Sequence, residues 1–324
     1  MFRSTERSSK SARWRSNIIP ACSGLFACAA LVTPIRIPQQ GSDHLRLELS
    51  GAAWSPALAR YVLVSDDVNE HGAKHVPQLF TLTDDGKLDA QPITIDGIDE
   101  LNDPESITPG PDGTLFVCTS HSVNKQGHLP QSRRQLLALA VAADHRAKIL
   151  GQVDLTTARN PDGSPPWGSD ARLDIEAVAY RDDALLIGLK SPLGADGSAR
   201  ILRLTQAAAV VKAGVIPVGA IQVWAEPQLC VAHGSATVCE GIADLAFLPD
   251  GALLAAANSP KGSPSDGGGS LWKLNAKGDA PVLVKRFAGL KPEGVALAPD
   301  HASAIVVFDT DGQAPLWIRW PLSP

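Results

Sequence analysis

Four glutamates recur at the same point of a degenerate repeat. Each precedes an apolar run, and a serine takes the corresponding place in a first copy: Glu105, Glu176, Glu240, Glu293 and Ser50. Carboxylates gathered at one place repel one another unless a cation, a proton or a base lies among them. Hard oxygen ligands of this kind suit Ca²⁺ or Mg²⁺ rather than zinc, and Ca²⁺ is the ion that we expect.

A second set of polar residues ends the apolar run that follows each of these positions. The members that could do chemistry are Asp66, His121, Lys190 and Asp309. If the two runs are antiparallel strands, the start of the first and the end of the second lie at one edge of the sheet. Asp66 and Asp309 would then join the metal-binding carboxylates, His121 would carry protons and Lys190 would pair with an anion.

The repeat predicts the elements that must position these residues. Each copy reads as two short apolar strands followed by two further strand candidates, and Asp112-Gly113 and Asp250-Gly251 supply tight turns. Four antiparallel strands repeated around a centre form a blade of a β-propeller, so the expected fold class is all-β. The motifs favour five blades, with six as the alternative.

The last copy contains one strand too few before the chain ends. Only Leu316 to Trp320 follows its first two strands, so a strand from the amino-terminal side must complete the blade. We expect His44 to Leu49 to supply it, because closing the ring removes exposed sheet edges. Asn160 to Asp170, rich in Pro and Gly, reads as an insertion in a loop.

Composition excludes several classes of protein. The 324 residues are 44% hydrophobic and 19% charged, with 28 Gly and 25 Pro. This apolar content excludes a disordered chain, and the low charge excludes a long coiled coil. The formal net charge of −5 disfavours nucleic acid as a partner, because phosphate binding depends on Lys and Arg.

The amino terminus has the pattern of an export signal. Residues 1–30 carry five basic residues against one acid and then an apolar run that is short for a membrane span. We therefore expect a signal over 1–30, a linker over 31–43 and one propeller domain over 44–324. The mature chain would be periplasmic or extracellular with no transmembrane span. Lipidation at Cys28, in a sequence similar to a lipobox, is the alternative.

The remaining cysteines fit an exported protein. Cys230 and Cys239 bracket a short loop and could form a disulfide in an oxidising compartment, whereas Cys118 lies in an apolar strand and reads as a small buried residue. We expect a monomer.

The chain also resembles a known family. The segments that carry the resemblance are Asp103-Pro104-Glu105 with Thr119 to Ser122, Asp174-Ile175-Glu176 with Gly188 to Leu193, Lys291 to Ala296, and Asp309 to Gly312. They resemble a bacterial family of exported propellers known as domain of unknown function 3616, over the chain from Ser50 onward. Ser106 and Ala177 stand where that pattern favours Gly, and Lys190 where it favours Arg. The family has no settled reaction, so the resemblance implies the fold more than the function.

Two functions follow as hypotheses. A looser similarity to phytase-like and lactonase-like propellers that bind Ca²⁺ implies a cation-dependent hydrolase of esters, phosphoesters or lactones at the mouth of the channel. The alternative is a non-catalytic propeller that presents its loops to a small molecule, a glycan or another partner. In a purely architectural interpretation, the glutamates would instead cap backbone N–H groups between blades.

Overall fold

The computed structural model describes residues 31–38, 47–68, 75–168, 173–259, 267–275, 279–310 and 313–322. Within these ranges the chain forms 22 strands and one α-helix, α1 (Ala207–Ala213), which confirms the all-β class. No helix in the described part is long and apolar enough to cross a membrane. The expected signal over 1–30, with Cys28, lies outside the described residues, so export and lipidation stay predictions.

The strands form four-stranded antiparallel units in which each strand pairs with the next along the chain. The first two units are β2 (Leu47–Ser55), β3 (Arg60–Val68), β4 (Gln78–Leu82) and β5 (Ile93–Asp96), then β6 (Pro104–Pro109), β7 (Thr114–Thr119), β8 (Leu136–Val141) and β9 (Arg146–Val153). Their outermost strands also pair with each other: β5 runs parallel to β9, which joins the two units into one eight-stranded sheet.

Two further units follow, separated by a short hairpin. They are β10 (Asp174–Arg181), β11 (Ala184–Ser191), β12 (Arg200–Thr205) and β13 (Ile221–Ala225), then β16 (Gly241–Phe247), β17 (Leu253–Asn258), β18 (Gly269–Leu274) and β19 (Val282–Phe287). The hairpin between them is β14 (Cys230–His233) with β15 (Ala236–Cys239). The final unit is β20 (Lys291–Leu297), β21 (Ser303–Asp309), β22 (Leu316–Pro321) and β1 (Thr33–Pro34).

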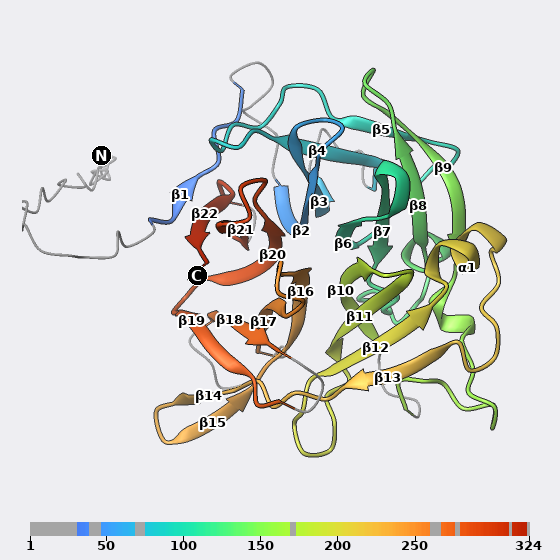
Figure 1. Cartoon of the computed structure of the whole chain (residues 1–324), viewed down its shortest axis with the longest axis vertical. Helices are drawn as coiled ribbons and strands as arrows, with labels where there is room; N and C mark the ends of the chain where they lie inside the picture. Colours follow the sequence, from blue (N-terminus) through green and yellow to red (C-terminus); the bar gives the residue numbers. More distant parts are fainter. Residues whose placement is uncertain are drawn as a thin grey trace, which may run out of the picture.

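The first strand of each unit lies innermost. These inner strands contact one another in a closed order, β2 to β6, β10, β16, β20 and back to β2. The sheets radiate from this centre (Figure 1), which is the arrangement of a β-propeller.

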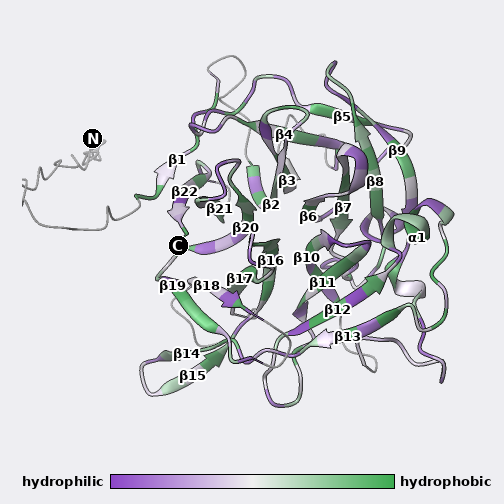
Figure 2. Cartoon of the chain, in the orientation of Figure 1, coloured by the Kyte–Doolittle hydropathy of each residue, from purple (hydrophilic) through white to green (hydrophobic). Residues whose placement is uncertain are grey.

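Apolar side chains fill the spaces between neighbouring units. Each of five core clusters draws its residues from two adjacent units, so no sheet buries its faces alone. In one cluster Phe116 of β7 is buried together with Ile187 of β11. Figure 2 shows hydrophobic residues along the strands and hydrophilic ones along many of the loops. Burial between units explains why each strand unit needs its neighbours for stability.

An amino-terminal strand closes the ring, but it is not the expected one. Thr33 pairs with Trp317 and Pro34 with Leu316, so β1 completes the last sheet from within the segment expected to be a linker. The prediction that His44 to Leu49 takes this place is wrong, because Leu47 and Leu49 belong to the inner strand β2 and are fully buried. Residues 44–46 lie outside the described ranges.

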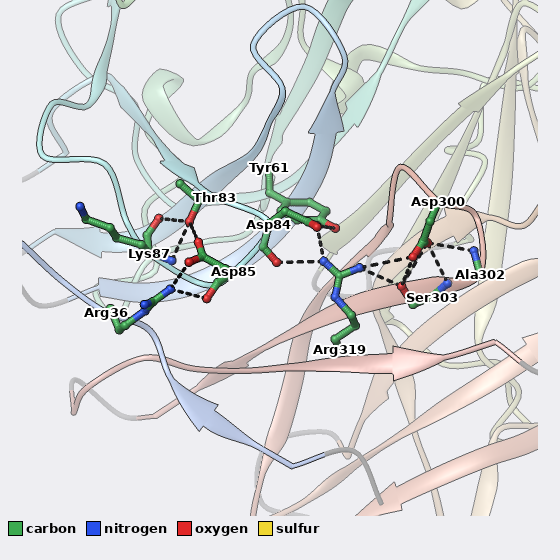
Figure 3. A network of polar contacts seen from close by, with 10 residues as sticks. All are labelled: Arg36, Tyr61, Thr83, Asp84, Asp85, Lys87, Asp300, Ala302, Ser303 and Arg319. Atoms are coloured by element: carbon green, nitrogen blue, oxygen red, sulfur yellow. Dashed lines mark hydrogen bonds and ion pairs between the residues drawn. The ribbon is translucent and has the colours of Figure 1, made fainter. Parts of the chain in front are cut away.

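Polar contacts reinforce this seam between the last unit and the first (Figure 3). Arg319 of β22 binds the side chains of Asp84 and Asp300, and the Tyr61 hydroxyl donates to Asp84 at 3.0 Å. Arg36, just after β1, pairs with Asp85 at 2.6 Å. The turn after β4, which contains Asp84 and Asp85, therefore holds β1 and β22 against the first unit.

The cysteines lie as the sequence indicates. Cys230 and Cys239 face each other across the β14–β15 pair and form a disulfide. Cys118 is a buried free thiol in β7, and burial raises its pKa. The hairpin itself was read from the sequence only as a short loop.

Candidate functional site

Each inner strand contains a β-bulge near its start, and in four of the five strands the bulged residue is the one that the repeat marks. The ladder shifts between Pro104 and Ser106, between Ile175 and Ala177, and between Pro292 and Gly294, which leaves Glu105, Glu176 and Glu293 unpaired. The same shift leaves Ser50 unpaired in β2 and Ala243 unpaired in β16. A bulge re-aims a side chain, so it can turn a residue of a buried strand toward the channel.

The bulges open onto a polar cavity of about 340 Å³, which we call the acidic mouth. Six carboxylates and two amines line it: Glu48, Asp66, Glu105, Glu176, Glu293, Asp309, Lys190 and Lys291. The ends of the second strands also reach it, at Asp66, Lys190, Asn258 and Asp309. The expected meeting of strand starts and strand ends at one mouth is therefore present for these residues.

Lys190 lies between two of the bulge glutamates. Its Nζ is 2.7 Å from Glu176 Oε2 and 3.8 Å from Glu293 Oε1. The two carboxylates raise the pKa of Lys190 well above its usual value despite the opposing effect of burial. Lys190 therefore stays protonated, and it carries a fixed positive charge that joins the third unit to the last.

A second group of acids lies nearer the first two units. Carboxylate oxygens of Asp66, Asp103 and Glu105 lie within 4.8 Å of one another. Arg133 forms an ion pair with Asp103, and its charge also lowers the pKa of Asp66. Burial nevertheless raises the pKa of Asp66 and raises that of Glu105 strongly, and Glu176 raises the latter further. Arg133 balances one of the three charges, so a proton or a cation is needed only for Asp66 and Glu105, whose pKa values are raised.

Glu105 differs from the other two bulge glutamates in its contacts. Within the described residues, no ion pair or hydrogen bond joins its carboxylate to another side chain, whereas Glu176 bonds Lys190 at 2.7 Å. Lys190 reaches Glu105 only as a more distant charge that lowers its pKa. Glu105 is thus the bulge glutamate most open to a ligand.

Asp309 also lines the mouth, where it forms an ion pair with Lys291. Its Oδ2 lies 3.1 Å from Lys291 Nζ, across the pairing of β20 with β21. Both side chains are partly exposed, so water weakens the attraction. The sequence placed Asp309 correctly at the mouth, although it is paired with an amine.

Glu240 does not join the mouth, contrary to the expectation from the repeat. Its carboxylate is fully buried within its own unit, where Ser270 Oγ and Trp272 Nε1 each donate to it at 3.2 Å and Arg286 Nη1 at 3.3 Å. It joins the start of β16 to β18 and β19. In this unit the architectural interpretation of the glutamates therefore holds.

The cause of this error is a shift of three residues in aligning the fourth copy. Glu105 and Glu293 each precede a Pro-Asp turn by six residues, at Pro111 and Pro299. Counting six residues back from Pro249 reaches Ala243, the bulged residue, and not Glu240. The turn spacing was thus a signal that could have placed the fourth copy correctly.

His121 also lies away from the mouth. It is 1% exposed, its Nδ1–H donates to the Thr119 carbonyl at 2.7 Å, and its Nε2 accepts from the Leu155 N–H at 3.2 Å. Burial lowers its pKa to about 4, so the ring is neutral at pH 7. Both ring nitrogens hold backbone groups together, which leaves neither free to carry protons at the mouth.

A buried aspartate that sequence reasoning missed closes the channel beneath the mouth. Asp244 follows the bulge of β16, at the position that Gly51, Ser106, Ala177 and Gly294 occupy in the other inner strands. Its Oδ2 accepts from the Val295 N–H and its Oδ1 from the Ser106 hydroxyl, both at 2.8 Å.

This aspartate reaches every inner strand. Hydrogen bonds from the backbone N–H groups of Ala52 and Leu245 lower its pKa, and Ser106 Oγ accepts from the Val178 N–H at 2.9 Å. Burial outweighs these bonds and raises the pKa of Asp244 well above its usual value. Small neighbours leave room for it: a Cβ on Gly51 would lie 2.8 Å from the Glu105 carbonyl oxygen. We call this the Asp244 layer.

Comparisons with known proteins leave the family open. Neither a known family nor a curated relative matches the sequence, so the resemblance to domain of unknown function 3616 stays a prediction.

Several solved structures are similar in arrangement at low identity. A gluconolactonase from Xanthomonas campestris is 12% identical with a TM-score of 0.44, over 93% of this chain and 100% of its own. The PQQ-bound aldose sugar dehydrogenase from Streptomyces coelicolor is 14% identical with a TM-score of 0.47, over 92% and 83%. A putative glucose dehydrogenase from Thermus thermophilus is 14% identical with a TM-score of 0.45, over 90% and 99%. We draw no functional argument from this level of similarity.

Proposed function

We propose that this chain is an exported five-bladed propeller whose acidic mouth binds a divalent cation, Ca²⁺ rather than Mg²⁺, and hydrolyses an ester, phosphoester or lactone there. The observation that carries the proposal is the approach of Asp66, Asp103 and Glu105 to within 4.8 Å of one another, with Asp66 and Glu105 lining the cavity of about 340 Å³. Burial raises the pKa of Asp66 and of Glu105, while Asp103 is paired with Arg133. Three carboxylates this close together are a donor set suited to Ca²⁺, which takes six to eight oxygen ligands in flexible geometry.

The closed order of the inner strands supports the blade count. Each of the five antiparallel units contributes one inner strand, and each inner strand contacts two others. A sixth blade without the motif would have to interrupt this order. The signal over residues 1–30 supports export, because its charge precedes an apolar run.

In this proposal the ligand set differs from the one expected from the sequence. Asp66, Asp103 and Glu105 would hold the ion, while Glu176 and Glu293 neutralise Lys190 and stand beside it. Glu240 is left out because its carboxylate binds Arg286, Trp272 and Ser270. A divalent cation supplies Lewis-acid polarisation of a carbonyl or phosphoryl oxygen when it is bound.

The remaining residues would orient the substrate and move the proton. Lys190 is protonated and its Nζ lines the cavity, so it can donate to an oxygen of the substrate. If it holds the cation, Glu105 is ionised, and its carboxylate can accept a proton from water in the cavity and return that proton to the leaving group. His121 has no part in this scheme, since its two ring nitrogens are engaged.

Calorimetry on the full chain tests the cation. We expect CaCl₂ to bind more tightly than MgCl₂, and Glu105→Gln to weaken Ca²⁺ binding at least about tenfold, because an amide carries no charge. Glu240→Gln is the matched control, a buried glutamate outside the mouth, and it should bind Ca²⁺ as the parent does. If neither ion binds the parent protein, the cation part of the proposal is lost.

Hydrolysis is tested separately with p-nitrophenyl acetate, p-nitrophenyl phosphate and δ-valerolactone. Turnover of one of them should fall at least about a hundredfold in Glu105→Gln, in the range of general acid–base effects. Turnover that survives in this variant would remove Glu105 from the chemistry.

A non-catalytic mouth is the second candidate, and one contact favours it. Lys190 shares its one positive charge between Glu176 and Glu293 and so joins two blades, which is an architectural task. This candidate predicts that a small molecule or glycan still binds after Glu293→Gln, while no ester, phosphoester or lactone is turned over. Deleting residues 160–168, part of the predicted insertion, should abolish binding if that loop presents the ligand surface.

A further inference from the structure

The opposite end of the channel holds a second cavity. It has a volume of about 260 Å³ and is lined by residues from all five inner strands. We propose that this apolar cavity is a binding site for a small organic cation with apolar substituents, such as a quaternary ammonium group. The site is separate from the acidic mouth and does not depend on the function proposed for it.

The Asp244 layer separates the two cavities. Asp244 and Ser106 fill the axis with a hydrogen-bonded network, and Gly51 and Gly294 bring the strand backbones close together there. A Cβ on Gly294 would lie 3.0 Å from the Gly51 backbone. A ligand in the apolar cavity therefore enters from the far end of the channel and cannot come through the mouth.

Small side chains hollow the cavity and aromatic ones wall it. Ala246 and Ala296 line it on two inner strands, while Trp54, Tyr180 and Phe247 line it from three. The three aromatic residues are half-buried, so part of each side chain is open to a ligand. A cavity of about 150 Å³ already holds a benzene ring, so this one accommodates a branched group of several carbons.

Charge at the rim selects a cation over a neutral ligand. Asp112, Asp182 and Asp183 are exposed in the turns beside Tyr180, and their negative charges contribute to raising the pKa of its hydroxyl. Among the described residues that line the cavity, none is a carboxylate, a lysine or an arginine. Apart from the exposed His301 the lining is mainly apolar, and Asp112 and Asp183 remain at the rim beside the Arg181–Asp182 pair, which suits a cation with an apolar body.

One aromatic wall already binds a cation. The Arg181 guanidinium carbon lies 5.4 Å from the centre of the Phe247 ring, within the range of a cation–π interaction, and Arg181 also pairs with Asp182 at 3.6 Å. Aromatic rings attract quaternary ammonium groups in the same way, because the ring face is negative. Arg181 takes up this attraction at Phe247 and opposes a second cation there, so Trp54 and Tyr180 are the rings that would contact the ligand.

Paired titrations with choline and 3,3-dimethyl-1-butanol, its uncharged isostere, test the proposal on the full chain by calorimetry. We expect choline to bind more tightly, and Trp54→Leu to weaken choline about tenfold while changing the isostere less, because only the cation loses a π interaction. Equal binding of the two compounds to the parent protein would overturn the choice of a cation.

Two further variants locate the site. Ala246→Leu should fill the cavity and abolish choline binding, and Glu105→Gln, at the acidic mouth, should leave it unchanged. The reverse result would assign choline to the mouth and overturn the proposal. Melting curves of each variant check the fold, and Asp183→Asn provides a surface variant that should weaken choline about two- to threefold, with a smaller effect at high salt.

Discussion

The two ends of the central channel are built from the same five strands yet have opposite chemistry. At one end, bulges turn Glu105, Glu176 and Glu293 into a cavity lined by six carboxylates. At the other end, alanines and aromatic rings line a cavity without carboxylate walls among the described residues. Less than one strand length separates them. The comparison teaches that strand register, more than composition, decides which residues meet a ligand.

Asp244 keeps the two ends apart, and its removal should have the largest effect. Asp244→Ala leaves the Val295 N–H and the Ser106 hydroxyl without their acceptor in a fully buried place. We expect the free energy of unfolding to fall by about 3–5 kcal/mol in urea titrations. Asp250→Ala, which removes an exposed aspartate from a turn of the same strand pair, is the control and should cost less than about 1 kcal/mol. Equal costs would contradict the role of the layer.

Lys190 balances the acidic end, so removing it should damage that end alone. Lys190→Met leaves Glu176 and Glu293 facing each other without a cation, and their pKa values should rise further. A carboxyl with a raised folded pKa loses stability as pH rises through that pKa. The variant should therefore be less stable than the parent by about 3 kcal/mol at pH 8 and by less at pH 5. A deficit independent of pH would contradict this pairing.

His121 lies at neither end of the channel. The pH dependence of stability tests whether it is a buried structural residue and not a residue of the mouth. Its pKa falls from 6.5 in an unfolded chain to about 4 in the fold. The neutral ring is therefore favoured by folding. The stability that this provides is complete above pH 6.5 and is lost as pH falls toward 4, by about 3 kcal/mol.

Urea unfolding measured at pH 7 and pH 4.5 tests His121. The variant His121→Gln should be less stable than the parent at pH 7 and should lose less stability between the two pH values. If the parent lost no more free energy of unfolding between pH 7 and pH 4.5 than the variant, the lowered pKa of His121 would be contradicted.

The smallest effect is expected from the partly exposed pair at the rim of the mouth. Lys291→Met breaks the 3.1 Å contact with Asp309, but water screens both groups. We expect a loss of stability below about 1 kcal/mol that shrinks in 1 M salt. A loss of stability as large as that of Lys190→Met would mean that water screens the ion pair at the rim no more than the one inside the mouth.

Much of the fold follows from the sequence, because apolar alternation and turn residues recur at each unit. The inner strands around Glu105, Glu176 and Glu293 lie where the pattern predicts them. Thr33 and Pro34 could not be recognised as the closing strand, since a two-residue strand has no periodicity to detect. It is defined only by the edge of β22 that it covers.

The site was predicted in part for similar physical reasons. Glu105, Glu176, Glu293, Lys190, Asp66 and Asp309 line the mouth because each position is set by strand direction alone. Glu240 and His121 were misplaced because a local motif does not reveal a shift in register or a left-handed turn, and His121 has a φ of 53°. Asp244 was missed because its partners Ser106 and Val295 come from other units, and Asp103 because its neighbour Asp66 does.

The bulges have a consequence for how such a protein can change over evolutionary time. A bulged residue takes no part in the ladder, so exchanging it leaves the pairing of its strand intact. Three residue types already occupy the five bulged positions of this chain: glutamate at three of them, Ser50 in β2 and Ala243 in β16. Single substitutions at the bulges could therefore change which ligand the mouth binds, one blade at a time, while the pairing of the strands stays the same.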